Sequence, residues 1–209
     1  MNLTLEHFRN LPEEKQQQII DSVILEFAQF GYDGASTNRM VEKAGISKGV
    51  LFKYFTSKEK LFLYVCRYLA EHQKAWLEMK RDQLPNDFFD ILRFYALRDL
   101  EYVIQEPIYY NFMEQITKNR THRVYQKAMG IFEEIGGDMF TAIMSTMPSE
   151  DLREGVTVGD AMNLILWVFN GFNQTMGDMV NGDFEQKKQK ILSELDKVLD
   201  LLKYGIYKR

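Results

Sequence analysis

Apolar residues recur three and four positions apart along most of the 209-residue chain, and no segment alternates between apolar and polar residues over a useful length. The first spacing places side chains on one face of an α-helix, whereas alternation is typical of a half-buried strand. The pattern therefore predicts an all-α fold without strands. It also excludes a membrane-spanning helix, because the chain lacks a run of about 18 apolar residues.

Local signals divide the first part of the chain into short helices. Apolar spacing over residues 20–28 predicts a first helix, and Gly31 is suited to the left-handed conformation that ends one. Thr37 is a favourable N-cap for a second helix, which Gly45 should stop. Ser47 can cap a third helix, so the segment predicts two short helices joined by a tight turn that contains glycine.

The remaining chain predicts a larger helical bundle. Thr56 and Glu59 have the spacing of a capping box, which favours a long fourth helix. Pro85 and Pro107 interrupt the helical pattern further along. We therefore expect about nine helices in two domains, a DNA-binding domain over residues 1–58 and an effector-binding and dimerisation domain over residues 59–209.

Positive charge is concentrated in one short segment of an acidic protein. Residues 36–60 contain six cations and two anions, a net charge of +4, which leaves −8 on the rest of a chain whose overall charge is −4. A local basic patch indicates an anionic partner more specifically than the overall charge does. Charge alone would favour the simpler alternative of a solvated helix face, and it is the side chains of the third short helix that favour an anionic partner.

This helix has two contrasting sides. Leu51 and Phe55 fall on one side, and Gly49, Val50 and Lys53 fall on the other. So short a helix is not stable alone in water, so it must pack through Leu51 and Phe55 and present its other side outwards. A glycine permits close approach of the backbone, a valine can contact a thymine methyl group, and a lysine can donate to a guanine or a phosphate. The segment therefore predicts a helix-turn-helix that enters the major groove.

The stretch GYDGASTNRMVEKAGISKGVLFKYFTSKEKLF closely resembles the N-terminal domain of the tetracycline-repressor (TetR) family of bacterial transcriptional regulators. The resemblance covers about residues 15–62 and includes the run from Ala44 to Ser47 and the run from Leu51 to Phe55. It implies a DNA-binding regulator, most simply a repressor that a small effector releases from its operator. Beyond residue 62 the resemblance is limited to the helical architecture and an aromatic-glycine segment, WVFNGF, similar to one in the penultimate helix of some members.

The resemblance and the helix-turn-helix reading together assign DNA contacts to ten residues. They are Thr37, Asn38, Ser47, Lys48, Gly49, Val50, Phe52, Lys53, Tyr54 and Lys58. By resemblance, Thr37, Tyr54 and Lys58 hold backbone phosphates. Position 52 is usually tyrosine in the family, so Phe52 lacks one hydroxyl and keeps only an apolar contact.

One helix-turn-helix reads too few bases for useful specificity, whereas a pair can read a palindromic operator, so a homodimer is expected. Two C-terminal segments are candidates for the contact between the two subunits. The segment over residues 160–180 is apolar on nearly all sides, and the last predicted helix carries a narrow apolar seam along one side. The predicted interface residues are Val168, Phe172, Met176, Ile191, Leu195, Val198 and Leu202. The alternative is that both helices only complete the core of the monomer.

The middle of the chain is rich in aromatic residues and methionine. Such residues usually form plain core, but the resemblance implies that some line a cavity for a small apolar or amphipathic effector. The candidates are Trp76, Phe94, Tyr95, Tyr110, Phe112, Tyr125, Met129, Phe132 and Trp167.

Other functional classes have little support in the sequence. His7, His72 and His122 lack the spacing of metal ligands, and no phosphate-binding glycine loop or nucleophilic serine motif occurs, so we expect no enzyme, metal or cofactor. The single cysteine, Cys66, permits no intrachain disulfide and favours a reducing compartment, the cytoplasm. The remaining alternative is a helical interaction protein that does not bind specific DNA.

Overall fold

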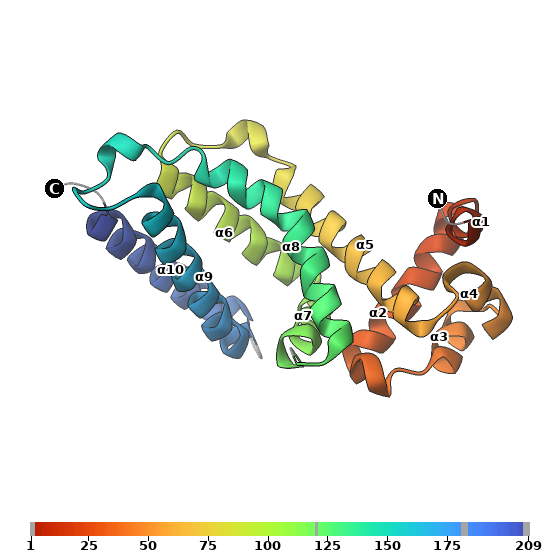
Figure 1. The fold of residues 1–209 in the computed structure, drawn as a ribbon. Coiled ribbons are helices and arrows are strands. Elements are labelled where there is room, and N and C mark those ends of the chain that lie inside the picture. The colour runs from red at the N-terminus through yellow and green to blue at the C-terminus, as the bar shows by residue number, and fades with distance from the viewer. Residues whose placement is uncertain (1–2, 120, 181–183, 207–209) are drawn as a thin grey trace. The chain divides into compact units, whose positions relative to one another are not determined.

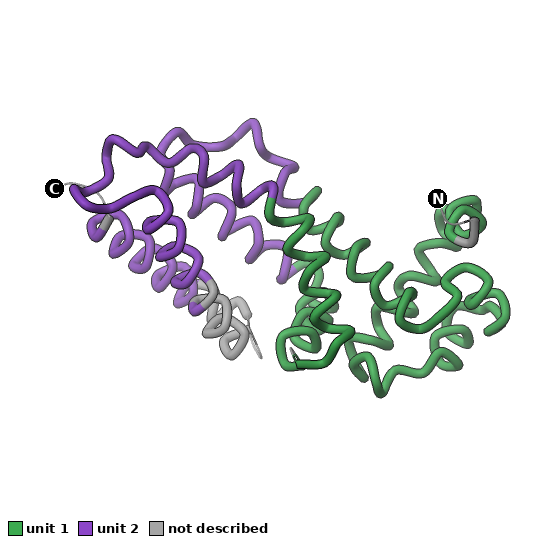
Figure 2. Tube along the Cα trace, in the orientation of Figure 1, with its two compact units in different colours: residues 1–75, 105–137 green, residues 76–104, 138–209 purple. Residues whose placement is uncertain are grey.

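The computed structural model of the chain describes residues 3–119, 121–180 and 184–206. Within them the fold consists of ten α-helices and two short 3₁₀-helices without a β-strand, which confirms the predicted all-α class (Figure 1). The chain divides into two compact units (Figure 2). Unit 1 comprises residues 1–75 and 105–137, and unit 2 comprises residues 76–104 and 138–209. None of the described helices is long and apolar enough to cross a membrane.

Unit 1 contains the predicted helix-turn-helix together with helices from later in the chain. Its helices are α1 (Leu3–Arg9), α2 (Glu13–Gly34), α3 (Thr37–Ala44), α4 (Lys48–Phe55), most of α5 (Lys58–Glu78), α7 (Pro107–Lys118) and the first part of α8 (Arg123–Met144). The predicted DNA-binding domain, residues 1–58, is therefore part of a larger compact unit.

The turns of unit 1 lie where the local sequence predicts them, but the N-caps of two helices are each shifted by one residue. Gly45 adopts the left-handed conformation (φ 61°, ψ 41°) after α3. The Ser47 hydroxyl accepts a hydrogen bond from the Val50 amide (3.3 Å), as expected of an N-cap. The N-cap of α3 is Ser36 rather than the predicted Thr37. At the start of α5 the capping hydroxyl belongs to Ser57 rather than Thr56, and it accepts from the Lys60 amide (3.2 Å).

Aromatic packing holds α2, α5, α7 and α8 together in unit 1. The Phe62 ring on α5 lies 4.9 Å from Phe27, 5.5 Å from Phe112 and 5.6 Å from Tyr125, centroid to centroid. Phe112 and Tyr125 are only 1% and 3% exposed. Phe112 and Tyr125, which were predicted to contact the effector, therefore lie in the closely packed core of unit 1, as aromatic residues at helical spacing usually do.

The end of α2 turns sharply at a glycine and is held by α7 and α8. Gly31 has φ 64°, and an added Cβ would lie 3.0 Å from Gln115 Oε1 and 3.1 Å from the Tyr125 hydroxyl. The Tyr125 hydroxyl accepts a hydrogen bond from the Tyr32 amide (2.6 Å), and the Gln115 amide donates to the Ala28 carbonyl (3.3 Å). Both the backbone angle and the space thus require glycine at residue 31.

Unit 2 is a separate helical bundle with its own core. It contains most of α6 (Phe88–Gln105), α9 (Val158–Val180), α10 (Phe184–Ile206), the ends of α5 and α8, and 3₁₀-helices at Arg81–Gln83 and Ser149–Asp151. Its core is formed by apolar residues of four helices, among them Phe88, Leu92, Met144, Ile165 and Leu195. Two ion pairs brace this bundle, Arg93 with Asp196 (2.6 Å) and Lys203 with Asp87 (3.0 Å).

The apolar seam of α10 faces the interior of unit 2. Ile191, Leu195 and Leu202 are 1%, 2% and 5% exposed, and Leu195 and Leu202 belong to the core that contains α6 and α9. A nearly fully buried side chain leaves almost no surface for a partner, so the burial of these three residues favours the alternative that the seam completes the core of the monomer. The partly buried Val168 and Val198 pack against the same core. Phe172 and Met176 lie outside the residues whose side chains the structure describes.

The single cysteine is part of the core of unit 1. Cys66 on α5 is fully buried, and burial raises the pKa of its thiol well above the usual range. A buried thiol that stays protonated behaves as a small apolar residue.

Candidate DNA-binding surface

The helix-turn-helix of unit 1 presents one side of α4 to solvent. Leu51 and Phe55 are 1% and 2% exposed, so they anchor the helix. Gly49 and Lys53 are exposed on the other side, and Val50 is half-buried beside them. The two-sided pattern read from the sequence is therefore present in the structure.

The exposed side of α4 offers close approach as well as charge. An added Cβ at Gly49 would meet only the Ser47 hydroxyl, at 3.9 Å, so the helix backbone is unobstructed there. Lys48 and Lys53 are exposed, and among the described residues neither has a hydrogen bond or ion pair with another protein group. Their ammonium groups are available to an external anion such as a phosphate.

The other predicted contacts lie around this side. Thr37 and Asn38 occupy the first turn of α3, where free backbone amides favour an anion, and Asn38 is exposed. Phe52 and Tyr54 are half-buried on α4. The structure thus places nine of the ten predicted residues in α3, in α4 or at the turn between them, and the tenth, Lys58, at the start of α5.

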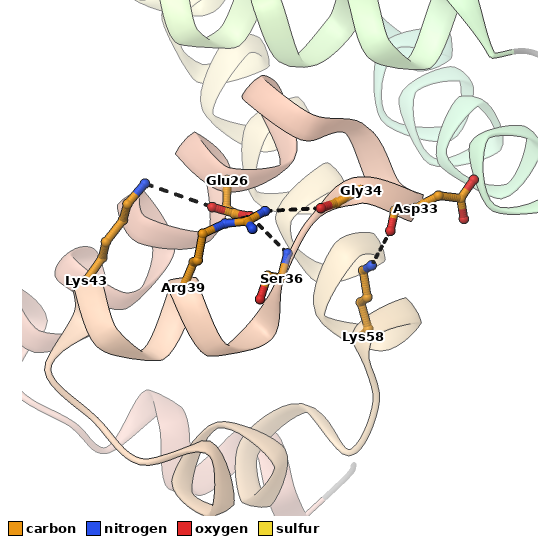
Figure 3. A network of polar contacts seen from close by, with 7 residues as sticks. All are labelled: Glu26, Asp33, Gly34, Ser36, Arg39, Lys43 and Lys58. Atoms are coloured by element: carbon orange, nitrogen blue, oxygen red, sulfur yellow. Dashed lines mark hydrogen bonds and ion pairs between the residues drawn. The ribbon is translucent and has the colours of Figure 1, made fainter.

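A buried carboxylate holds the start of α3 in place (Figure 3). Glu26 on α2 is 0% exposed, and its Oε1 accepts hydrogen bonds from the Ser36 amide (2.9 Å) and from Arg39 Nε (2.8 Å). Arg39 Nη2 also contacts Glu26 Oε1 and donates to the Gly34 carbonyl (3.1 Å). Among the described residues Glu26 Oε2 has no hydrogen-bond partner, and Lys43 Nζ lies 3.9 Å from it.

These partners keep Glu26 ionised. Burial alone would raise the pKa of the carboxyl group, but the hydrogen bonds from Arg39 and Ser36 and the charges of Arg39 and Lys43 outweigh it and lower the pKa. The network therefore ties two cations of the basic segment to a buried anion. Glu26 was not predicted from the sequence. The signal that could have identified it is a charged residue next to Phe27 on the apolar side of α2.

Lys58 is also engaged within the protein (Figure 3). Its ammonium group donates to the Asp33 carbonyl (3.2 Å) and lies 5.0 Å from the centroid of the Tyr32 ring. Burial lowers the pKa of Lys58, against the opposing charges of Asp33 and Glu26. Lys58 thus neutralises the C-terminal end of α2, where a cation is favoured, and it contacts a phosphate only if it leaves this position or shares its donors.

The residues predicted to contact the effector are divided between the two units. Trp76, Phe94, Tyr95 and Trp167 belong to unit 2, and the other five residues belong to unit 1. The Trp76 indole donates to the Arg98 carbonyl (3.0 Å) and the Arg98 guanidinium stacks 4.5 Å from the Trp76 ring, whereas Trp167 is 71% exposed. Tyr110, Met129 and Phe132 are half-buried in unit 1.

Known proteins of similar sequence match this chain over the helix-turn-helix segment. The family model described as bacterial regulatory proteins, tetR family, matches residues 19–65. The transcriptional repressor AcnR of Corynebacterium efficiens is 41% identical over 56 residues, which are 27% of this chain and 30% of that protein. The alignment thus spans about a third of the length of the curated relatives that the chain matches.

Solved structures extend the likeness to the whole fold. A TetR-family regulator from Chloroflexus aurantiacus superposes with a TM-score of 0.71 at 24% identity, over 98% of each chain. The regulator FadR of Bacillus subtilis, solved in complex with stearoyl-CoA, has a TM-score of 0.69 at 18% identity, over 91% of this chain and 99% of FadR. The helix-turn-helix segment, residues 19–65, thus matches the TetR family of bacterial regulatory proteins, and the whole chain has the fold of solved TetR-family regulators.

Proposed function

We propose that the protein is a transcriptional regulator that binds operator DNA through the exposed side of α4. The observation that supports this most directly is the division of α4 into a buried side, Leu51 and Phe55, and an exposed side with Gly49 and Lys53. An α-helix of this kind fits the major groove, and a family of DNA-binding regulators shares the surrounding sequence.

Replacing Lys53 by alanine tests this proposal. Lys53 faces the groove, so Lys53→Ala should weaken operator binding by about 10-fold and relax the preference for operator over unrelated DNA. Fluorescence anisotropy at several salt concentrations gives both quantities. Lys60→Ala is the matched control, because Lys60 is also exposed but lies on α5, outside the proposed contact. Equal losses for both variants would contradict a groove-facing role for Lys53.

The proposed regulator acts as a homodimer on a palindromic operator, and the exposed side of unit 2 supports this part of the proposal. Trp167 on α9 and Leu201 and Tyr204 on α10 are 71%, 67% and 66% exposed, and Leu164 is 40% exposed. Apolar side chains of this size on the last two helices form the surface expected of a self-association site. Two copies of α4 would then read two half-sites one helical turn apart.

The proposed effector is a small apolar or amphipathic molecule, and the regulator is a repressor that the effector releases from DNA. FadR, which shares the fold, was solved with an acyl thioester, and the many aromatic residues in the middle of this chain suit an apolar chain. An effector that prefers the DNA-free conformation shifts the population away from the operator-bound one, and effective release requires a difference of several kcal/mol.

A thermal-shift experiment with a long-chain acyl-CoA and the matching free fatty acid tests the effector class. Ligand at about 100 times its Kd should stabilise the folded protein by about 2.7 kcal/mol and raise its Tm. The same ligand should displace labelled operator in the anisotropy assay. A rise in Tm without displacement would contradict the release mechanism, and no rise with either compound would contradict this effector class.

The alternative, a helical interaction protein that does not bind specific DNA, predicts a different result. Such a protein would retain no genomic fragment in a gel shift even at low salt. An enzymatic function has no support, since the TetR family, which the helix-turn-helix segment matches, is non-enzymatic.

A further inference from the structure

We propose that α1 supports the DNA-binding helix α4 and that Phe8 is a positioning residue for Tyr54. The inference rests on the proposed DNA-binding function. Helix α1 (Leu3–Arg9) lies outside residues 19–65, the part that the family model matches. Figure 1 shows α1 beside α4, and the two helices are in direct contact.

Phe8 is the anchor of this contact. Its side chain is 0% exposed. Its ring centroid lies 5.0 Å from Phe55, 5.6 Å from Tyr54 and 5.7 Å from Tyr64, and Phe55 lies 5.1 Å from Tyr64. The four rings therefore form one cluster that joins α1, α4 and α5, with edge-to-face contacts of the kind that fix ring orientation.

Helix α1 is itself held in place by the start of α2. The side-chain amide of Gln16 donates to the Arg9 carbonyl (3.0 Å) and to the Leu11 carbonyl (2.8 Å). The Leu11 amide donates to the Phe8 carbonyl (3.1 Å), which closes the turn after α1. Because these bonds fix the end of α1, Phe8 is a rigid support rather than part of a loose N-terminal arm.

Tyr54 connects this cluster to the DNA-binding surface. It is the half-buried aromatic residue on α4 whose hydroxyl is assigned to a phosphate, and the edge contact with Phe8 limits the orientations of its ring. A tyrosine held in one orientation loses less conformational entropy when its hydroxyl binds a phosphate. Removing Phe8 should therefore reduce operator affinity through Tyr54, although Phe8 itself is buried and contacts no DNA.

A double-mutant cycle on the full-length protein tests the proposal. Phe8→Leu should weaken operator binding about fivefold, and in the Tyr54→Phe background the same change should have almost no further effect, because the hydroxyl it positions is absent. Affinities are measured by anisotropy at a temperature well below the Tm of every variant. A merely structural role for Phe8 would give the same fold-loss in both backgrounds, and that result would overturn the inference.

Phe112→Leu is the matched control. Phe112 is a buried phenylalanine of unit 1, 1% exposed, and its ring contact is with Phe62 on α5 rather than with α4. We expect it to lower the Tm to a similar extent and to change operator affinity less than twofold. An equal loss of affinity in Phe8→Leu and Phe112→Leu would show a general packing effect and would contradict the proposal.

A second variant serves if Phe8→Leu does not fold. Gln16→Ala removes the two hydrogen bonds to the turn after α1 without opening the core, and it should produce a smaller loss of affinity that again depends on the Tyr54 hydroxyl. An unchanged affinity in Gln16→Ala would then overturn the inference. Failure of the wild-type protein to bind any DNA fragment would overturn the proposed function and this inference together, whereas normal operator binding with additive variants would overturn the inference alone.

Discussion

Replacing Gly49 by leucine is expected to abolish specific operator binding while the protein remains folded. Gly49 is an exposed residue in the first turn of α4, and an added Cβ would meet only the Ser47 hydroxyl at 3.9 Å. Leucine favours a helix more than glycine does, by nearly 1 kcal/mol, so the Tm should stay unchanged or rise. A branched side chain at this position would instead keep the helix backbone away from the base edges of the major groove.

Anisotropy with labelled operator should show a loss of about 100-fold or more in affinity, which corresponds to about 2.7 kcal/mol. Gly130→Leu is the matched control, because Gly130 is an exposed helical glycine on α8 with no other side chain near its Cβ position. A Gly49→Leu protein that bound operator as well as Gly130→Leu would show that this side of α4 does not enter the groove.

Placing charges on the exposed apolar surface of unit 2 is expected to produce a folded monomer with little affinity for the operator. Trp167→Asp combined with Leu201→Asp changes two side chains that are 71% and 67% exposed, so neither substitution buries a charge in the unit. Two carboxylates in a self-complementary contact would face unpaired apolar surface and each other across the two-fold axis.

Because two linked half-sites bind far more tightly than one, the loss of the dimer should lower operator affinity on the order of 100-fold. Sedimentation equilibrium measures the mass, and circular dichroism checks the fold. Met79→Asp is the matched control, since Met79 is an equally exposed apolar residue of unit 2, at 66%, outside the α9 and α10 surface. A dimer of unchanged stability in the double variant would contradict the assignment of this surface.

A charged substitution in the buried apolar seam of α10 is expected to have a different effect. Leu195 is 2% exposed, so Leu195→Asp would place a carboxylate in the core and unfold unit 2 rather than separate two folded subunits. Operator binding would be lost in either case. The difference between a folded monomer and a disordered chain is therefore visible only in the circular dichroism spectrum.

Short-range chemistry made the helix-turn-helix predictable from the sequence. The left-handed Gly45, the hydroxyl cap of Ser47 and the two-sided pattern of α4 each depend on residues within a few positions of one another. The cap at Thr37 was displaced by one residue because the Glu26 carboxylate, ten residues earlier, takes the Ser36 amide. A neighbouring hydroxyl residue cannot be distinguished as a cap when the decisive partner lies on another helix.

Contacts between distant segments could not be predicted in this way. The spacing of Ile191, Leu195 and Leu202 correctly indicated an apolar seam, but a seam has the same periodicity whether its partner is in the same chain or in a second copy. The packing of Phe8 against Tyr54 joins residues 46 positions apart, and no local pattern signals it. The aromatic residues selected from the sequence as effector contacts fall in two different units, and periodicity along the chain carries no information about such an arrangement.

The bond between the Tyr125 hydroxyl and the Tyr32 amide affects how this protein can be used to build hybrid sensors. A chimera spliced directly after residue 58 would carry the DNA-reading helices but leave Gln115 and Tyr125 behind, so α2 would end without its two supporting side chains. The transferable module is therefore discontinuous in sequence. A working graft has to import residues 105–137 along with the N-terminal segment, or supply substitutes for both side chains from the recipient.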